Sequence, residues 1–163
     1  MLFEVNAPIF TETHLKITAV LDGDSIKVAS IFNKHEKEIR LYGIDAPEVK
    51  VCRKLKEDEM KTQLAGEFIM YLGQLATRYV LSIAPPGTKI TLITERDNFQ
   101  DFYKRQLAYV ILPDGSCLNE ILLTAGYAKP MNEYSCSKLP DFQILNLAAK
   151  QAGQGLYAYA PNF

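Results

Sequence analysis

Apolar and polar residues alternate along the first part of the chain, as at Ile26 and Val28 and again at Ile39 and Leu41. Alternation with a period of two predicts strands that have one buried face. Segments with strand character occur five times. They cover residues 15–21, 25–30, 37–44, 89–94 and 105–112.

The period changes between residues 57 and 81, where apolar side chains recur at intervals of three and four. This spacing predicts one amphipathic helix with a broad face toward the core. Shorter helices are expected at residues 118–125 and 139–151, whereas residues 1–13 and 127–137 are expected to be irregular. Five strands and three helices in this order predict an α+β fold.

A chain of 163 residues is long enough for one domain with a sizeable core, and we expect residues 1–163 to form it. The composition, 48% hydrophobic and 23% charged, is typical of a soluble globular protein. No apolar run approaches the ~20 residues of a membrane span, so we expect no association with a membrane. No signal peptide is visible, and the protein is either cytoplasmic or exported with its signal already removed.

The net charge is −1 and the isoelectric point is about 6.1, which argues against tight, static binding to nucleic acid. A nuclease is less constrained by this balance, because a metal ion and two arginines can provide positive charge locally. Basic residues between positions 50 and 61 are interrupted by acidic ones, and we interpret them as the solvated start of a helix in preference to a patch that binds a nucleic-acid strand. They are Lys50, Arg53, Lys54, Lys56 and Lys61.

The three cysteines, Cys52, Cys117 and Cys136, show neither CxxC spacing nor histidines at zinc-binding spacing. We interpret them as structural, with one disulfide allowed if the protein is exported. The two histidines, His14 and His35, are expected on the surface, so a histidine-based mechanism has little support.

Charged residues gather at the ends of the predicted strands in one short stretch, and they are Asp22, Asp24, Arg40, Asp45 and Glu48. Charge near a core is costly unless it is paired or bound to metal, and oxygen ligands suit calcium or magnesium. An arginine binds phosphate through two hydrogen bonds, and a carboxylate off the metal can act as general base toward water. With Arg105 as a second cation, this set predicts a site for phosphodiester hydrolysis.

Each of these residues, taken alone, also has a plain structural interpretation. Asp-Gly is a strong hairpin-turn signal, so residues 22–24 could simply form a turn. Arg40 alone could be an exposed strand residue. The spacing of the whole set favours the functional interpretation.

Four segments, VLDGDSIKV, IRLYGIDAPE, DFYKRQLAYV and LNEILLTAGYA, occur in the order and register of the staphylococcal nuclease (thermonuclease) family, which this chain resembles over roughly residues 14–158. The block that contains Arg40, Asp45, Pro47 and Glu48 is the most specific of these signals. The resemblance implies a five-stranded OB-like β-barrel with three α-helices.

The resemblance also implies roles for individual residues. Asp24, Asp45 and the backbone carbonyl of Ala46 would hold one calcium ion. Arg40 and Arg105 would bind the phosphate, and Glu48 would orient or deprotonate the attacking water. Asp22 would either hold the metal ligands in place without contacting the metal, or have only a structural role in the turn.

Two positions depart from the usual family pattern. Ala46 stands where threonine is common, which a backbone ligand tolerates. Lys104 stands where glycine is usual, and a lysine there would be strained if the position takes a positive φ. Lys104 could displace Arg105 or add a cation near the phosphate. Tyr103 and Tyr134 are weaker candidates for substrate contacts, and simple packing would also explain both.

The expected function is that of a monomeric, calcium-dependent nuclease that cuts DNA and RNA with little base specificity and prefers single strands. Similarity to the family implies cleavage of the 5′ P–O bond, which leaves 3′-phosphate ends. One alternative is a catalytically inactive nuclease-like module that binds nucleic acid or protein. Another is a magnesium-dependent phosphodiesterase acting on small nucleotides.

Overall fold

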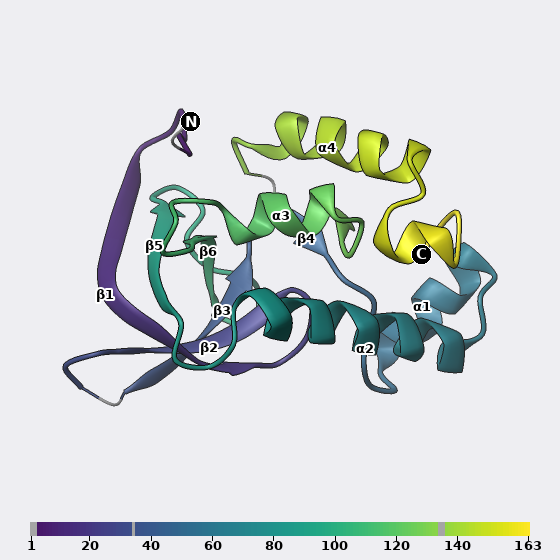
Figure 1. Ribbon diagram of the computed structural model, residues 1–163, viewed down its shortest axis with the longest axis horizontal. Coiled ribbons are helices and arrows are strands. Elements are labelled where there is room, and N and C mark those ends of the chain that lie inside the picture. The colour runs from purple at the N-terminus through teal and green to yellow at the C-terminus, as the bar shows by residue number, and fades with distance from the viewer. Residues whose placement is uncertain (1–2, 34, 134–135) are drawn as a thin grey trace.

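A closed five-stranded barrel forms one half of the molecule in the computed structural model, which describes residues 3–33, 35–133 and 136–163 (Figure 1). Neighbouring strands pair in the order β1-β2-β3-β6-β5. The barrel and the helices beside it confirm the α+β class and the OB-like architecture. The strands are β1 (Ile9–Val20), β2 (Ser25–Ser30), β3 (Glu36–Leu41), β5 (Lys89–Glu95) and β6 (Gln106–Ile111).

The pairing of β3 with β6 is parallel, whereas the other barrel pairs are antiparallel. Arg40 lies opposite Leu107 in this register. Since Arg105 directly precedes β6, the parallel pairing brings the two predicted phosphate-binding arginines to the same region of the barrel.

Strand β1 begins at Ile9, so the expectation of an irregular segment over residues 1–13 is wrong for the part that pairs with β5. The sequence signal is weak there because most side chains of this stretch are partly or fully exposed. A change of register between Ile17 and Ala19 bends β1, and bends of this kind help a sheet to close.

The helix expected over residues 57–81 is two helices, α1 (Arg53–Thr62) and α2 (Gly66–Ile83). Gln63 ends α1 in the left-handed conformation, with φ of 61°. The Glu59 carboxylate then accepts a hydrogen bond from the Gly66 backbone N–H at the start of α2. The apolar spacing continues across this break, which explains why the sequence suggested a single helix.

The described residues contain four α-helices rather than three, because the long one is divided. The other two are α3 (Leu118–Thr124) and α4 (Leu139–Gln151), close to the expected bounds, and a short 3-10 helix, η1 (Gly155–Ala158), follows. No described helix has the length and apolarity that a membrane crossing requires.

A small second sheet lies beside the barrel. It consists of β4 (Ile44–Asp45) and β7 (Lys129–Pro130), which pair antiparallel. The expectation of irregular structure over residues 127–137 is therefore wrong at β7. This pairing fixes Asp45, a predicted metal ligand, to a distant part of the chain.

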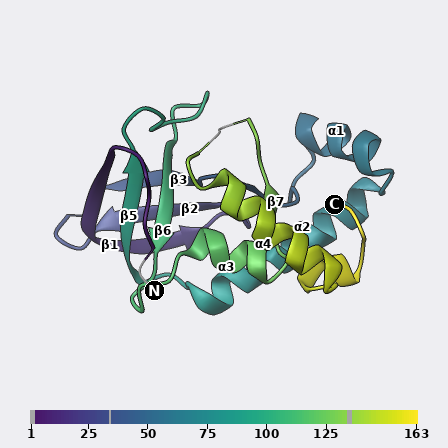
Figure 2. The ribbon, with the colours of Figure 1, turned by 90° about the horizontal axis from the view of Figure 1, so that it is seen from above.

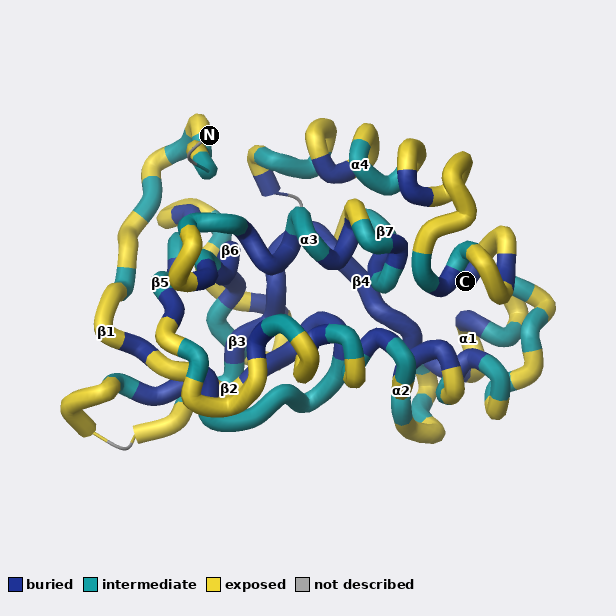
Figure 3. The backbone as a smooth tube through the Cα atoms, viewed as in Figure 1, coloured by how far each residue is buried: buried dark blue, intermediate teal, exposed yellow. Residues whose placement is uncertain are grey.

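The main core fills the barrel and extends under α3 and α4, with a smaller core between α2 and η1 (Figure 3). Helix α2 runs along the lower side in Figure 1 and α4 along the upper side, with α3 between them. Helix α1 lies apart from the five barrel strands (Figure 2). The three cysteines lie in the described part of the chain and carry free thiols, and both histidines are exposed.

Candidate active site

A pocket of about 650 Å³ opens between the barrel, α1 and the segment that follows β7. The structure brings together in it most of the residues that the sequence singled out. Ala46 is buried close by, Lys104 is exposed on an adjoining loop, and Tyr134 lies outside the described residues. The predicted residues that line the pocket are Asp22, Asp24, Arg40, Asp45, Glu48, Tyr103 and Arg105.

Arg40 is almost completely buried, with 5% of its surface exposed. Its Nη1 donates hydrogen bonds to the backbone carbonyls of Leu41 and Ile44, at 3.1 and 2.9 Å. Its Nη2 lies 3.3 Å from Asp24 Oδ2 and 3.6 Å from Asp45 Oδ1. The guanidinium is therefore held by the chain that turns around it, and its charge supports two of the carboxylates.

Asp24 is fixed at the floor of the pocket. Its Oδ2 accepts a hydrogen bond of 2.9 Å from the Ala46 backbone N–H, and its Oδ1 accepts one of 3.1 Å from Ser25. Burial alone would raise the pKa of Asp24, but the Arg40 charge and the hydrogen bonds from the Asp22 side chain and the Ala46 backbone hold it below its usual value. Asp24 is therefore an ionised carboxylate.

Asp22 is in the opposite situation. Its Oδ1 accepts a hydrogen bond of 3.0 Å from the Asp24 backbone N–H, which fixes its carboxyl group beside Asp24. Burial and the negative charge of Asp24 together raise the pKa of Asp22 to about 8. The turn therefore holds one carboxylate and one carboxyl group that keeps its proton near neutral pH.

This difference predicts the effect of Asp22→Asn on the stability of the metal-free protein. Between about pH 4 and about pH 8 the folded state holds a proton on Asp22 that the unfolded state has lost, so stability falls as pH rises through this window. Asparagine removes this loss. We expect the variant to be more stable than the parent by several kcal/mol at pH 8, about 5 kcal/mol at most, with little difference at pH 4. Urea unfolding in chelator at both pH values measures this, with Asp97→Asn as an exposed control. A difference that does not grow with pH would contradict the assignment.

Two glycines let the site pack closely against α2. A Cβ at Gly73 would lie 2.6 Å from the Pro47 carbonyl oxygen and 2.7 Å from that of Glu48. A Cβ at Gly23 would lie 2.6 Å from the Cβ of Ala46. It would also lie 2.9 Å from the Cβ of Ala76 in α2, so the missing side chains allow both loops that carry the acidic residues to pack against this helix. Sequence reasoning missed this role of Gly73.

Lys54 is the main site residue that sequence reasoning missed. Its Nζ lies 3.0 Å from Asp45 Oδ1, 3.1 Å from Glu48 Oε1 and 3.2 Å from Asp58 Oδ2. Burial would lower the pKa of Lys54, but Asp45 and Glu48 outweigh this and raise it. The basic residues here were interpreted as solvated. That interpretation holds for Arg53, whose side chain is 94% exposed, and it is wrong for Lys54. The sequence did contain one signal of this, because Lys54 and Asp58 are four residues apart, a spacing that allows an ion pair on a helix.

Arg105 is held by the loop before it. Asp101, whose side chain is fully buried, accepts hydrogen bonds from the backbone N–H and the Nε of Arg105, at 2.9 and 2.7 Å. Burial would lower the pKa of Arg105, but the bond and charge of Asp101 raise it. Lys104 adopts φ of 61°, at a cost on the order of 1 kcal/mol for a residue with a side chain. Arg105 lines the pocket despite this substitution.

The same loop exposes two aromatic side chains at the mouth of the pocket. Phe102 is 87% exposed and Tyr103 is 79% exposed, and both line the pocket. The Arg105 guanidinium lies 5.6 Å from the centre of the Tyr103 ring. Large exposed aromatic residues beside a charged site are typical of surfaces that bind a partner.

The residues present fit a single hard cation with few protein ligands. Among the described residues, no three acidic, histidine or cysteine side chains form a ready-made metal cluster. Two carboxylates and one backbone carbonyl, with water, would not need such a cluster. Asp45 Oδ1 is buried and lacks a well-aligned hydrogen bond, although Lys54 and Arg40 lie near it. Burial and the charge of Asp24 raise the pKa of Asp45, so its carboxylate form is disfavoured without a metal, and a nearby cation would favour that form.

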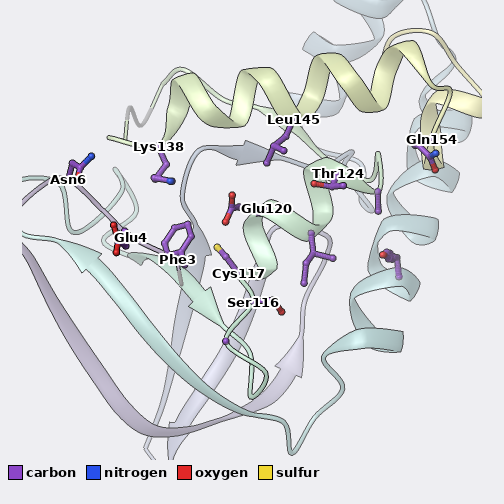
Figure 4. A pocket seen from close by; sticks show the side chains of 14 residues that line it. Phe3, Glu4, Asn6, Ser116, Cys117, Glu120, Thr124, Lys138, Leu145 and Gln154 are labelled. Atoms are coloured by element: carbon purple, nitrogen blue, oxygen red, sulfur yellow. The ribbon is translucent and has the colours of Figure 1, made fainter. Parts of the chain in front are cut away.

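A second, larger hollow of about 1020 Å³ lies between α3, α4 and the N-terminal segment, and shares no residue with this pocket (Figure 4). Its lining includes Cys117, Glu120 and Lys138. Burial raises the pKa of Cys117 to about 12, so this thiol is not a nucleophile at neutral pH. The chemistry expected from the sequence belongs to the other pocket.

Comparison with known proteins indicates a family. The family described as "Staphylococcal nuclease homologue" matches residues 38–159. An uncharacterized endonuclease of Escherichia coli O157:H7 is 29% identical over 162 residues, which are 98% of this chain and 88% of that protein. Endonuclease YhcR of Bacillus subtilis is 31% identical over 144 residues, which are 86% of this chain but 11% of that protein.

Proposed function

Because this chain belongs to the staphylococcal nuclease homologue family, we propose that it is a calcium-dependent nuclease that hydrolyses phosphodiester bonds of DNA and RNA. The family and the relatives named as endonucleases support a hydrolase of this kind. The observation that carries the proposal is the convergence in one pocket of the four acidic residues and the two arginines that the sequence singled out. They are Asp22, Asp24, Asp45, Glu48, Arg40 and Arg105.

A calcium ion, held by Asp24, Asp45 and the Ala46 carbonyl, would supply positive charge next to the phosphate. Arg105 binds a phosphate oxygen from the loop side, where Asp101 fixes its orientation. Arg40 acts from the floor of the pocket, and both cations stabilise the charge that develops on the phosphate.

Glu48 is the proposed acceptor for the proton of the attacking water. Its side chain is 25% exposed, so water reaches it, and its backbone rests on Gly73 of α2. A base needs a fixed position relative to the phosphate, since small displacements lower the rate strongly. The rigid helix behind Glu48 provides this position.

The proposed substrate is a flexible single strand, bound by a monomer with little regard to base identity. The proposed polar contacts go to phosphate and metal, which carry no sequence information. Tyr103, together with Phe102, offers rings on which unpaired bases can stack, and Lys104 adds charge beside them. Tyr134 stays a prediction outside the described residues. Cleavage of the 5′ P–O bond to leave 3′-phosphate ends rests on the family resemblance.

The main rival is an inactive nuclease-like module that binds nucleic acid or protein. Such a module would not need a base, two arginines and a carboxylate cluster in one pocket. The strained Lys104 and the acidic isoelectric point of about 6.1 are the features that favour this rival.

Digestion of single-stranded DNA, single-stranded RNA and duplex DNA with calcium, magnesium or chelator tests the proposal. We expect calcium-dependent digestion, faster on single strands, with ends that block polymerase extension until a phosphatase removes the 3′-phosphate. Arg105→Ala should lower the rate strongly. If folded protein digests no polymer in any metal, the proposal is wrong. Cleavage of a dinucleotide analogue would then indicate the small-nucleotide phosphodiesterase, and strand binding without cleavage would indicate the rival module.

A further inference from the structure

Lys54 lies beside a residue that is proposed to bind the calcium ion. Its ammonium group lies within 3.2 Å of one oxygen each from Asp45, Glu48 and Asp58. Asp45 is a proposed metal ligand and Glu48 the proposed base, and their side chains are only 10% and 25% exposed. An ammonium group between partly buried carboxylates neutralises their charge, as a bound metal cation would.

We propose that Lys54 is a tethered cation that balances the carboxylates of the metal-free site and that calcium must displace to bind. This inference rests on the proposed function, because it concerns the same ion. It assigns to α1 a role beyond packing, since that helix carries the competing charge. The expected consequence is a calcium affinity lower than the carboxylates alone would give.

Asp58 is the proposed partner of the Lys54 ammonium group once calcium has displaced it from Asp45 and Glu48. It lies one helical turn after Lys54 on α1, and the two side chains are already 3.2 Å apart. Asp58 is buried, with 9% of its surface exposed. Its ion pair with Lys54 does not involve the proposed metal ligands. Displacement by calcium therefore breaks the contacts with Asp45 and Glu48 and leaves the contact with Asp58 in place.

The alternative is a purely structural role, in which the ion pairs of Lys54 anchor α1 to Asp45 and Glu48. The two interpretations predict different changes in metal binding. If the role of Lys54 is purely structural, its removal leaves the carboxylates less well positioned, and calcium binds equally or less well. If Lys54 is a competitor, its removal strengthens calcium binding, because like charges at one site repel each other.

Calorimetric titration of the full chain with calcium alone, without nucleic acid, tests the inference. We expect Lys54→Met to bind calcium about tenfold or more tightly than the parent, within the usual range of coupling between two sites. Lys56→Met is the matched control, since Lys56 is exposed on the same helix, and it should bind like the parent. Lys54→Gln repeats the test with a polar side chain if methionine disturbs the fold, which circular dichroism reports.

Asp58→Asn should shift the affinity in the opposite direction, because Lys54 then has only Asp45 and Glu48 as partners. In the Lys54→Met background the same change should have little effect if Asp58 acts through Lys54. Weaker binding from Asp58→Asn in both backgrounds would instead make Asp58 a metal ligand and overturn its assigned role.

The outcomes separate this inference from the proposed function. If the parent binds calcium and Lys54→Met binds it no more tightly, the inference is wrong and the proposed function stands. If Lys54→Met binds more tightly but the parent cuts no nucleic acid, the inference stands and the proposed function is wrong. If neither protein binds calcium at millimolar concentration, both are wrong.

Discussion

Replacing Arg40 with methionine is expected to destabilise the protein by about 3–5 kcal/mol and to abolish cleavage. The guanidinium is buried, and it supports Asp24 and Asp45 while it bonds the carbonyls of Leu41 and Ile44. Methionine fills much of the space but leaves two buried carboxylates without this partner. Urea unfolding at pH 7 in chelator measures the loss, which should shrink at lower pH as the carboxylates take up protons.

Arg105→Met is the matched control for this prediction. Arg105 is partly exposed, and its side chain bonds one buried carboxylate, Asp101, which also accepts hydrogen bonds from the backbone N–H groups of Tyr103 and Arg105. We expect loss of cleavage by about 10²-fold or more, with a destabilisation smaller than that of Arg40→Met, because these backbone bonds remain. Equal destabilisation by the two substitutions would contradict the structural difference between the arginines.

The second large effect is expected from Glu48→Gln, which should lower kcat by about 10²–10⁴-fold. Glutamine has nearly the same shape but is a far weaker proton acceptor. Single-turnover digestion of labelled single-stranded DNA measures the chemical step. Calcium should still bind, because Glu48 is not a proposed ligand.

Glu57→Gln controls for the loss of a charge in the pocket. Glu57 also lines the pocket, but its side chain is 50% exposed and pairs with Arg53. This variant should cut at nearly the parental rate. A Glu48→Gln enzyme that kept more than about a tenth of the parental kcat would remove Glu48 from the role of base.

Most strand segments and the grouping of the acidic residues could be predicted from local sequence, whereas the barrel was expected from the family resemblance. Alternation identified β2, and the charged residues at strand ends identified Asp24, Arg40 and Asp45, which the structure does bring together. Residue types alone could not show that Arg40 would be buried, because a strand arginine with one polar face is compatible with exposure.

The features missed depend on contacts between distant segments. The break at Gln63 leaves the apolar spacing of the two helices in phase, so no local signal marks it. Lys54 enters the pocket because α1 is a separate helix and can lie close to Asp45. Gly73 was inconspicuous within a helical pattern, and only its approach to the Pro47 and Glu48 carbonyls explains it.

The parallel pairing of β3 with β6 has a consequence for the timing of activity during synthesis. Strand β6 joins β3 only after α1, α2 and β5, which lie between them in the chain, have been made. Contacts so distant in sequence form late in folding. A nascent chain that already carries Asp24, Arg40 and Glu48 still lacks Arg105. An enzyme that cuts RNA would thus stay inactive while the ribosome translates the segment before Arg105.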